Sequence, residues 1–507
     1  MKIHVRNPVF LISALIISIL VIIGATDSER FGNVSEMLFE FTTTNFGWFY
    51  LLSVFMFVVF LTTLALSKYG KIKLGPPNSK PEYSFFTWIG MLFSAGFGAG
   101  LVFWGVAEPM SHLLETPFHN VDGNTEEAAR IAMGYSFFHW GVSQWSVFAI
   151  VGLLIGFLQF RKNKQGLIST ATETVLGKNK TVAYTIDSLA VIATVMGIAT
   201  SLGLGILQMN GGLQAVFNVP NSLWIQLVIT GVLLIIYLFS SSTGINKGIK
   251  WLSNVNLGLC LVLLVFVFIT GPTVFILNSF TLGIGDYLTN FISYSLRISP
   301  YGEEGESAWL QEWTIFYWAW VIAWSPFVGS FVARVSRGRT IREFIGGVLI
   351  VPPLIACFWI AAFGGTGLHS DLMNGTQIAE VVIEDETLAL FEMYNHLPLS
   401  SLLSVLSLLL IATFLITSAD SATYILGSMT TNGSLTPPLA IKMVWGVLMA
   451  AIAGVLLAAG GLNALQTASL VAALPFTIII FIFAYAFFIM IRREPLPERK
   501  PIPKKRV

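Results

Sequence analysis

The sequence predicts an all-α polytopic membrane protein with about twelve transmembrane helices, and three observations lead to this fold class. Hydrophobic residues make up 55% of the 507-residue chain, and charged residues make up only 11%. Apolar runs of about 20 residues recur from end to end, and each can cross a hydrocarbon core of roughly 30 Å. Basic residues gather after alternate runs, as expected for short cytoplasmic loops.

The apolar runs place twelve spans along the chain. They are expected near residues 8–25, 48–67, 85–107, 132–160, 182–217, 223–241, 253–277, 310–335, 341–366, 399–427, 438–460 and 466–491. The first run follows a short basic start, as a signal sequence would. It lacks a small-residue cleavage site and further spans follow, so we interpret it as an anchor.

Loop charge supports this count independently. The even-numbered exits with a clear bias are basic, through Lys68, Lys71, Lys73, Lys80, Arg161, Lys162, Lys164, Lys247, Lys250, Arg334, Arg337, Arg339 and Arg342. Odd-numbered exits are acidic or neutral, with Asp27, Glu29, Glu126, Glu127, Glu303, Glu304, Glu306, Glu384, Asp385 and Glu386. The pattern predicts that both termini face the cytoplasm of a bacterial cell membrane.

The third span is predicted to be a broken helix. Gly96, Gly98 and Gly100 are spaced by two, and each glycine costs a helix interior roughly 1 kcal/mol relative to alanine. Broken backbone at membrane depth is tolerated where it is buried in protein or lines a cavity. The ends of the two half-helices offer N–H groups to an anion and carbonyl groups to a cation. We therefore expect a binding site at this break.

A second weak point is expected five spans later. In the eighth span, Ser325, Pro326 and Gly329 interrupt an otherwise apolar helix. Corresponding breaks suggest two leading helices followed by a five-plus-five inverted repeat. The predicted units are 1–84 (two leading helices), 85–277 (first repeat), 278–308 (surface helix and connection), 309–491 (second repeat) and 492–507 (basic cytoplasmic tail).

Three connecting segments are given their own interpretation. Residues 283–300 alternate apolar and polar positions at helical spacing, which indicates an amphipathic helix on the outer surface. Residues 372–397 are expected to form another short external helix. The tail alternates proline with basic residues, and both a positive-inside anchor and a regulatory role remain open for it.

Five motifs stand out along the chain: GMLFSAGFGAGLVFWGVAEPMSH, FFHWGVSQWS, ATSLGLGILQ, FYWAWVIAWSPFVGSFVARVSRGRTIREF and FLITSADSATY. Together they resemble the betaine-choline-carnitine transporter (BCCT) family, and most closely its Gram-positive glycine betaine uptake systems. The resemblance covers nearly the whole chain. It implies a LeuT-type inverted-repeat fold, a homotrimer, and alternating-access import of osmolytes such as glycine betaine, with sodium as coupling ion and no other cofactor.

The resemblance implies an aromatic cage for a trimethylammonium group, which aromatic faces hold by cation–π attraction. The matching positions are Trp140, Trp145, Phe148, Trp320, Val321 and Trp324. Val321 stands where betaine-binding members usually have tryptophan, and Phe148 where related proteins often have tyrosine. The pocket could be larger, could bind quaternary ammonium more weakly, or could take dimethylglycine, sarcosine, glycine, choline or carnitine. Core packing or an interface belt is the alternative for these rings.

The same resemblance implies an anion site and a sodium site at the break. Backbone N–H groups of Gly96, Phe97, Gly98, Ala99 and Gly100 would hold a carboxylate, and Ala99 lacks the bulk common in the family. Sodium would be coordinated by the Ser94, Phe97 and Phe414 carbonyls with the Thr417 and Ser418 hydroxyls. The alternative for these hydroxyls is a hydrogen bond back to their own helix.

A second sodium site is known in some members of the family, and here it would fall at Thr194 and Phe327. It is expected to be weakened, because Ile198 lacks the hydroxyl that would help one turn after Thr194, Phe148 lacks a phenol and Val321 lacks an aromatic ring. Proton coupling through Glu108, His112, His139, Asp187 or Asp420 is the alternative to sodium. For His139 a structural hydrogen bond is preferred.

Other classes of function find little support. The chain has no HExxH, phosphate-binding GxxxxGK[ST] or nucleophile-elbow motif, so an enzyme is not expected. No uninterrupted run of charged positions predicts a channel pore. A net charge of +1 with no basic face outside the membrane ends gives no sign of a nucleic-acid partner. Cys260 and Cys357 lie within apolar spans and are interpreted as buried small residues.

Overall fold

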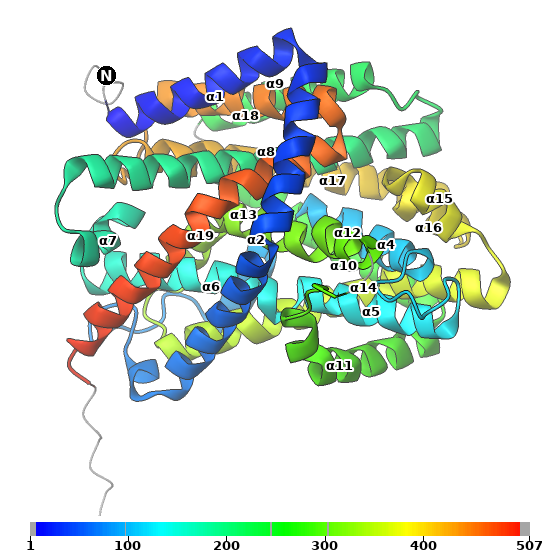
Figure 1. The fold of residues 1–507 in the computed structure, drawn as a ribbon, viewed down its shortest axis with the longest axis horizontal. Coiled ribbons are helices and arrows are strands. Elements are labelled where there is room, and N and C mark those ends of the chain that lie inside the picture. Colours follow the sequence, from blue (N-terminus) through cyan, green and yellow to red (C-terminus); the bar gives the residue numbers. More distant parts are fainter. Residues whose placement is uncertain (1–6, 97, 244–245, 302–303, 497–507) are drawn as a thin grey trace, which may run out of the picture.

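The protein is a helical bundle, and a computed structural model describes its residues 7–96, 98–243, 246–301 and 304–496 (Figure 1). Within these ranges, eleven helices are long and apolar enough to cross a membrane. The third predicted span is instead divided into α3 (Phe85–Gly96) and α4 (Ala99–Leu114), neither of which could cross alone. These eleven helices and the divided third span confirm the predicted all-α polytopic membrane protein.

The other long helices follow the predicted order. They are α1 (Pro8–Thr26), α2 (Ser28–Leu66), α5 (Glu126–Trp140), α6 (Val142–Gly156), α8 (Lys180–Phe217), α9 (Leu223–Thr243), α10 (Asn246–Thr270), α11 (Thr273–Ser295), α13 (Phe316–Val335), α14 (Ile341–Asn374), α17 (Ser400–Met429), α18 (Leu439–Gly460) and α19 (Leu462–Arg492). Short turns and helices connect them: η1 (Lys68–Lys71), η2 (Phe157–Arg161), α7 (Ile168–Leu176), α12 (Glu304–Leu310), η3 (Gln311–Ile315), α15 (Ile378–Glu384), η4 (Glu386–Leu388) and α16 (Ala389–Asn395).

Helix α13 lies at the centre of the bundle, against α6, α8 and α19 (Figure 1). It approaches α6 closely, because a Cβ added to Gly329 would lie 2.9 Å from the backbone nitrogen of Gly152. Small residues at such crossings allow two membrane helices to pack backbone against backbone. The core helix is thereby held against the helix that carries the predicted cage residues Trp145 and Phe148.

The predicted weak point in the eighth span does not end the helix, because α13 continues through Pro326. Proline removes one backbone donor, the one that would reach the carbonyl of Ile322. The hydroxyl of Ser325 donates to that carbonyl instead, at 2.7 Å. Gly329 serves the α6 crossing. The five-plus-five repeat therefore stays a prediction that this helix does not support by a break.

The structure places two other interruptions that the predicted spans lack. The fourth span is divided at Gly141, where the backbone N–H of Val142 donates to the Tyr287 hydroxyl at 2.8 Å. The seventh span ends at Thr270, before Gly271 and Pro272, and α11 follows at once. The surface helix is thus longer than predicted and starts ten residues earlier than 283, because the glycine–proline pair ends the preceding helix.

The smaller expectations have mixed outcomes. The segment 372–397 holds the end of α14 and the short elements α15, η4 and α16, rather than a single helix. Cys260 and Cys357 are buried free thiols, as predicted. Most of the basic tail lies outside the described residues.

At the end of α19 the chain is tied to the loop that follows α6. The carboxylate of Glu494 accepts a hydrogen bond from the Arg161 guanidinium at 2.8 Å and pairs with Lys162. Burial alone would raise the pKa of Glu494, but these two cationic partners lower it overall. The ion pair anchors the predicted cytoplasmic end of α19.

Candidate substrate and ion site

The site is organised by the break between α3 and α4. Gly98 has extended backbone angles, φ −131° and ψ −174°, and begins α4 without a side-chain cap. The first N–H groups of a helix have no partner within the helix, and they carry its positive dipole end. Ser94 and Gly96 fall in the last turn of α3, and Phe97 lies outside the described residues.

A small, partly open cavity lies against this break. Four elements line it: α4 with Gly98, Ala99 and Gly100, α8 with Ile198, Ser201 and Leu202, α13 with Trp324 and Phe327, and α17 with Leu415 and Ser418. Six of these ten residues were predicted as site residues. The predicted site is thus brought together in part from helices far apart in the chain.

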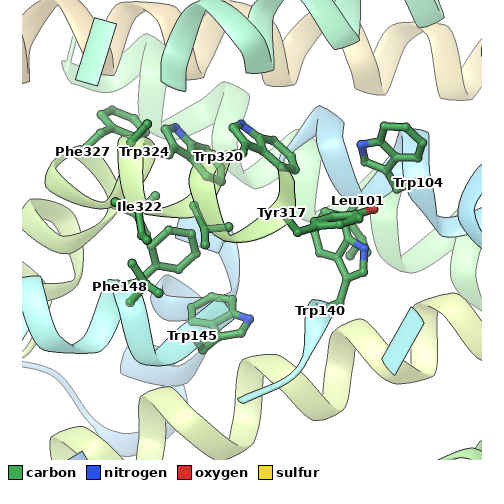
Figure 2. Close-up of a cluster of buried hydrophobic side chains, with 14 of the residues drawn as sticks. Leu101, Trp104, Trp140, Trp145, Phe148, Tyr317, Trp320, Ile322, Trp324 and Phe327 are labelled. Atoms are coloured by element: carbon green, nitrogen blue, oxygen red, sulfur yellow. The ribbon is translucent and has the colours of Figure 1, made fainter. Parts of the chain in front are cut away.

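One wall of the cavity belongs to a column of parallel rings on α13 (Figure 2). The rings of Trp320 and Trp324 are 5.9 Å apart at an angle of 8°, and Phe327 continues the column 6.1 Å beyond Trp324. The indole N–H of Trp320 donates to the Ser201 hydroxyl at 3.2 Å. Residues three or four apart share one face of a helix, so the spacing itself produces the column.

The rings of α5 and α6 reach this column from the side. Phe148 meets Trp324 edge to face at 5.7 Å, Trp145 meets Phe148 at 5.6 Å, and Trp140 meets Trp320 at 6.2 Å. All three residues are buried in the aromatic cluster of Figure 2 and are not part of the cavity lining. Val321 is also fully buried, one residue along α13 from the column and outside the lining.

Glu108 connects three helices around Trp140. Its Oε2 accepts the indole N–H of Trp140 at 2.9 Å and the hydroxyl of Tyr317 at 2.6 Å, while His139 Nδ1 lies 2.6 Å from its Oε1. The sequence indicated Glu108 and His139 as unusual ionisable groups within a membrane segment. The sequence did not indicate that these two residues meet, or that Glu108 also binds Tyr317, which is 209 residues away in the chain.

The predicted sodium ligands separate into two groups. Ser418 lines the cavity. The Thr417 hydroxyl donates back along α17 to the carbonyls of Thr413 and Phe414, at 2.9 and 3.1 Å, and faces Asn256 of α10 at 3.4 Å. Neighbouring residues on a helix differ in direction by about 100°. In this arrangement Thr417 makes the alternative bond, back to its own helix.

The remaining candidates are positioned by other contacts. The hydroxyl of Thr194 donates to the Ala190 carbonyl at 2.7 Å, away from the lining, whereas Phe327 lines the cavity. Asp187 accepts from the backbone N–H and the hydroxyl of Ser169, which fixes the start of α7. Asp420 accepts from Ser240 of α9 at 2.6 Å. These two carboxylates hold helices together and do not line the cavity beside the break.

A broken helix beside a cavity in the middle of a bundle of membrane-crossing helices is the architecture of a multi-pass transporter. The model of the betaine/carnitine/choline family transporters matches residues 8–496. The chain therefore belongs to the BCCT family, whose members and relatives are transporters and not enzymes.

Known relatives span nearly the whole chain. An ectoine/hydroxyectoine transporter of Virgibacillus pantothenticus is 67% identical, over 97% of this chain and 98% of its own length. A glycine betaine transporter of Bacillus subtilis (strain 168) is 46% identical over 96% and 95% of the two chains. An osmo-dependent choline transporter of Acinetobacter baylyi is 36% identical over 97% of this chain and 72% of its own length. The chain is thus a transporter of the type that moves compatible solutes.

Proposed function

We propose that this protein imports ectoine and hydroxyectoine, with glycine betaine as a weaker substrate, by sodium-coupled alternating access. The observation that carries the proposal is the cavity itself, which is lined by the indole of Trp324, two serines and the uncapped start of a helix. The 67% identity with an ectoine/hydroxyectoine transporter adds support.

The cavity suits the chemistry of a cyclic amidinium carboxylate. Its positive charge is spread over a flat ring, which can lie on the indole of Trp324 by cation–π attraction. Unlike a trimethylammonium group, the amidinium also has N–H donors, and the hydroxyl of Ser418 would supply an acceptor. The Ser201 hydroxyl already accepts from the Trp320 indole and donates to the Gly197 carbonyl. A carboxylate would be held by the first backbone N–H groups of α4. A trimethylammonium ligand would leave the Ser418 acceptor unused, which costs affinity.

The coupling ion is proposed to be sodium, held beside the break. Ser418, which lines the cavity, would supply a hydroxyl ligand, and the carbonyls of the α3 end would complete the oxygen ligands. Thr417 would coordinate the ion only if its hydroxyl turned away from the carbonyls of its own helix. The five-plus-five LeuT-type repeat, the homotrimer and the cytoplasmic position of both termini are parts of the same proposal.

Uptake of radiolabelled solutes tests the substrate. In cells lacking other osmolyte importers, ectoine should be taken up saturably and with a lower KM than glycine betaine, dimethylglycine, choline or carnitine. A lower KM for betaine than for ectoine would contradict the proposed preference. In proteoliposomes, an imposed sodium gradient should drive accumulation at equal internal and external pH. Accumulation driven by a pH gradient in sodium-free buffer would show proton coupling instead.

A further inference from the structure

A second cluster of ionisable side chains lies deeper along α4, outside the cavity lining. Glu108 and His112 of α4 and His139 of α5 are fully buried, and one possible ligand atom from each lies within 4.8 Å of the others. His139 Nδ1 is 2.6 Å from Glu108 Oε1, and His112 Nε2 is 3.5 Å from the same oxygen. Both imidazoles are therefore directed at a single carboxylate oxygen.

The surroundings orient two of these three groups. His139 Nε2 lies 2.9 Å from the Thr314 hydroxyl. Without metal, the 2.6 Å contact has Nδ1–H donating to Glu108. A bound metal would take the other tautomer, in which Nε2–H donates to Thr314 and Nδ1 is left with a lone pair for the ion. The second carboxylate oxygen of Glu108 accepts from Trp140 and Tyr317, which leaves Oε1, the oxygen that both imidazoles face, as the ligand atom. Metal-binding histidines and carboxylates in proteins are held by outer partners of this kind.

His112 provides an independent observation. Neither of its ring nitrogens makes a hydrogen bond within the described residues, although the side chain is completely buried. Its ring packs between Trp309 and Trp313, with centroids 4.8 and 4.4 Å away. Leaving a buried polar group without a partner costs about 1 to 3 kcal/mol. The packing holds an unpartnered imidazole facing a carboxylate and a second imidazole.

We propose that Glu108, His112 and His139 bind one divalent transition-metal ion, with Zn²⁺ as the preferred ion. Two imidazole nitrogens and one carboxylate oxygen are a ligand set that Zn²⁺ uses, with bonds of about 2.0 to 2.2 Å. Tetrahedral ligands at that length are about 3.3 Å apart. The distance from His112 to Glu108 is already close to this value. Metal binding must lengthen the contact of His139 with Glu108 and bring the two imidazole nitrogens, which lie within 4.8 Å, to about this spacing.

The ion would join α4 to α5 beside Trp140, independently of the substrate and of the coupling ion. It binds to Glu108, whose other oxygen holds Trp140 and Tyr317, so metal occupancy should stiffen the aromatic cluster. The expected effect is on stability and on the geometry of the cluster. The site takes no part in moving charge across the membrane.

Metal analysis of the purified full-length protein tests the proposal. The protein should carry a purification tag without histidine, be exposed to Zn²⁺ and then be dialysed. We expect about one zinc per chain, and a loss of at least tenfold in His112→Ala and His112→Phe, the second of which keeps an aromatic ring against Trp309 and Trp313. His119→Ala, at an exposed position in the loop after α4, is the matched control and should keep the metal.

A spectroscopic measurement separates a built site from loose binding. Co²⁺ in place of zinc should give the intense visible absorption of a tetrahedral ion in wild type and in His119→Ala, and should give none in His112→Phe. Zinc should also raise the thermal unfolding temperature of wild type and leave that of His112→Phe unchanged. Wild-type protein without metal, or His112 variants that keep zinc, would overturn the proposal, and the cluster would then be an ion pair only.

Discussion

Gly100 is the position where the smallest change should have the largest effect on transport. A Cβ at this residue would lie 2.6 Å from Cη2 and 3.2 Å from Cζ2 of Trp320. Ordinary contacts of this kind are about 3.5 to 4.0 Å. In Gly100→Ala, the indole must therefore move by roughly 1 Å.

The column of rings leaves Trp320 little room for that shift. Its ring lies between Phe316, 5.8 Å away at 2°, and Trp324, 5.9 Å away at 8°. Overpacking of such a core costs about 1 to 3 kcal/mol. If this cost destabilises the conformation that binds substrate, KM for the substrate should rise by about 5- to 150-fold. The hydrogen bond from Trp320 to Ser201 should weaken as well.

The measurement is concentration-dependent uptake, together with the thermal unfolding of the purified protein. Gly346→Ala is the matched control, because a Cβ there has no neighbour within 4 Å and should change neither quantity. Gly98→Ala adds a methyl group 3.7 Å from Trp324, an ordinary contact, and should have the weaker effect of the two cavity glycines. If Gly100→Ala keeps the wild-type KM and stability, then Trp320 is free to move away from α4, and the reasoning is refuted.

The remaining predictions concern four other contacts. Glu108→Ala should lower the unfolding free energy by about 3 kcal/mol or more, because three buried donors lose their acceptor; thermal unfolding in detergent would measure this, and an unchanged transition would contradict it. Ser418→Ala should raise the sodium concentration needed for half-maximal uptake more than Thr417→Ala does, because only Ser418 lines the cavity; equal effects would place both hydroxyls on the ion. Val321→Trp should reduce the yield of folded protein, because the site is fully buried; improved betaine uptake by a stable variant would mean that Val321 faces the substrate. Glu494→Gln should destabilise the protein at pH 7, and the difference from wild type should shrink in acid. The pKa of Glu494 is lowered in the folded state, so its stabilisation is complete above the unfolded pKa of about 4.3 and disappears as the pH falls through the folded value. A pH-independent difference would show that packing, not charge, anchors the end of α19.

The amino-acid sequence alone determined the class of the protein and its family, and it predicted the helix break beside which the cavity lies. The length and apolar content of the spans are local properties, and the bilayer sets a fixed length for them, so twelve crossings could be counted directly. The glycine spacing at Gly96, Gly98 and Gly100 predicted the break between α3 and α4, because the absence of Cβ atoms acts on the local backbone. Pro326 did not break its helix, because the Ser325 hydroxyl replaces the missing donor.

Only the tertiary structure decided which of the predicted residues meet. The cavity joins Ser201 of α8 with Ser418 of α17, and the Glu108 carboxylate joins Trp140 with Tyr317 across 209 residues. Rotation of each helix about its axis sets which side chains face a neighbour, and that rotation depends on packing between helices, not on local sequence. For this reason Thr417 and Ser418, adjacent in the chain, make contacts with different parts of the protein.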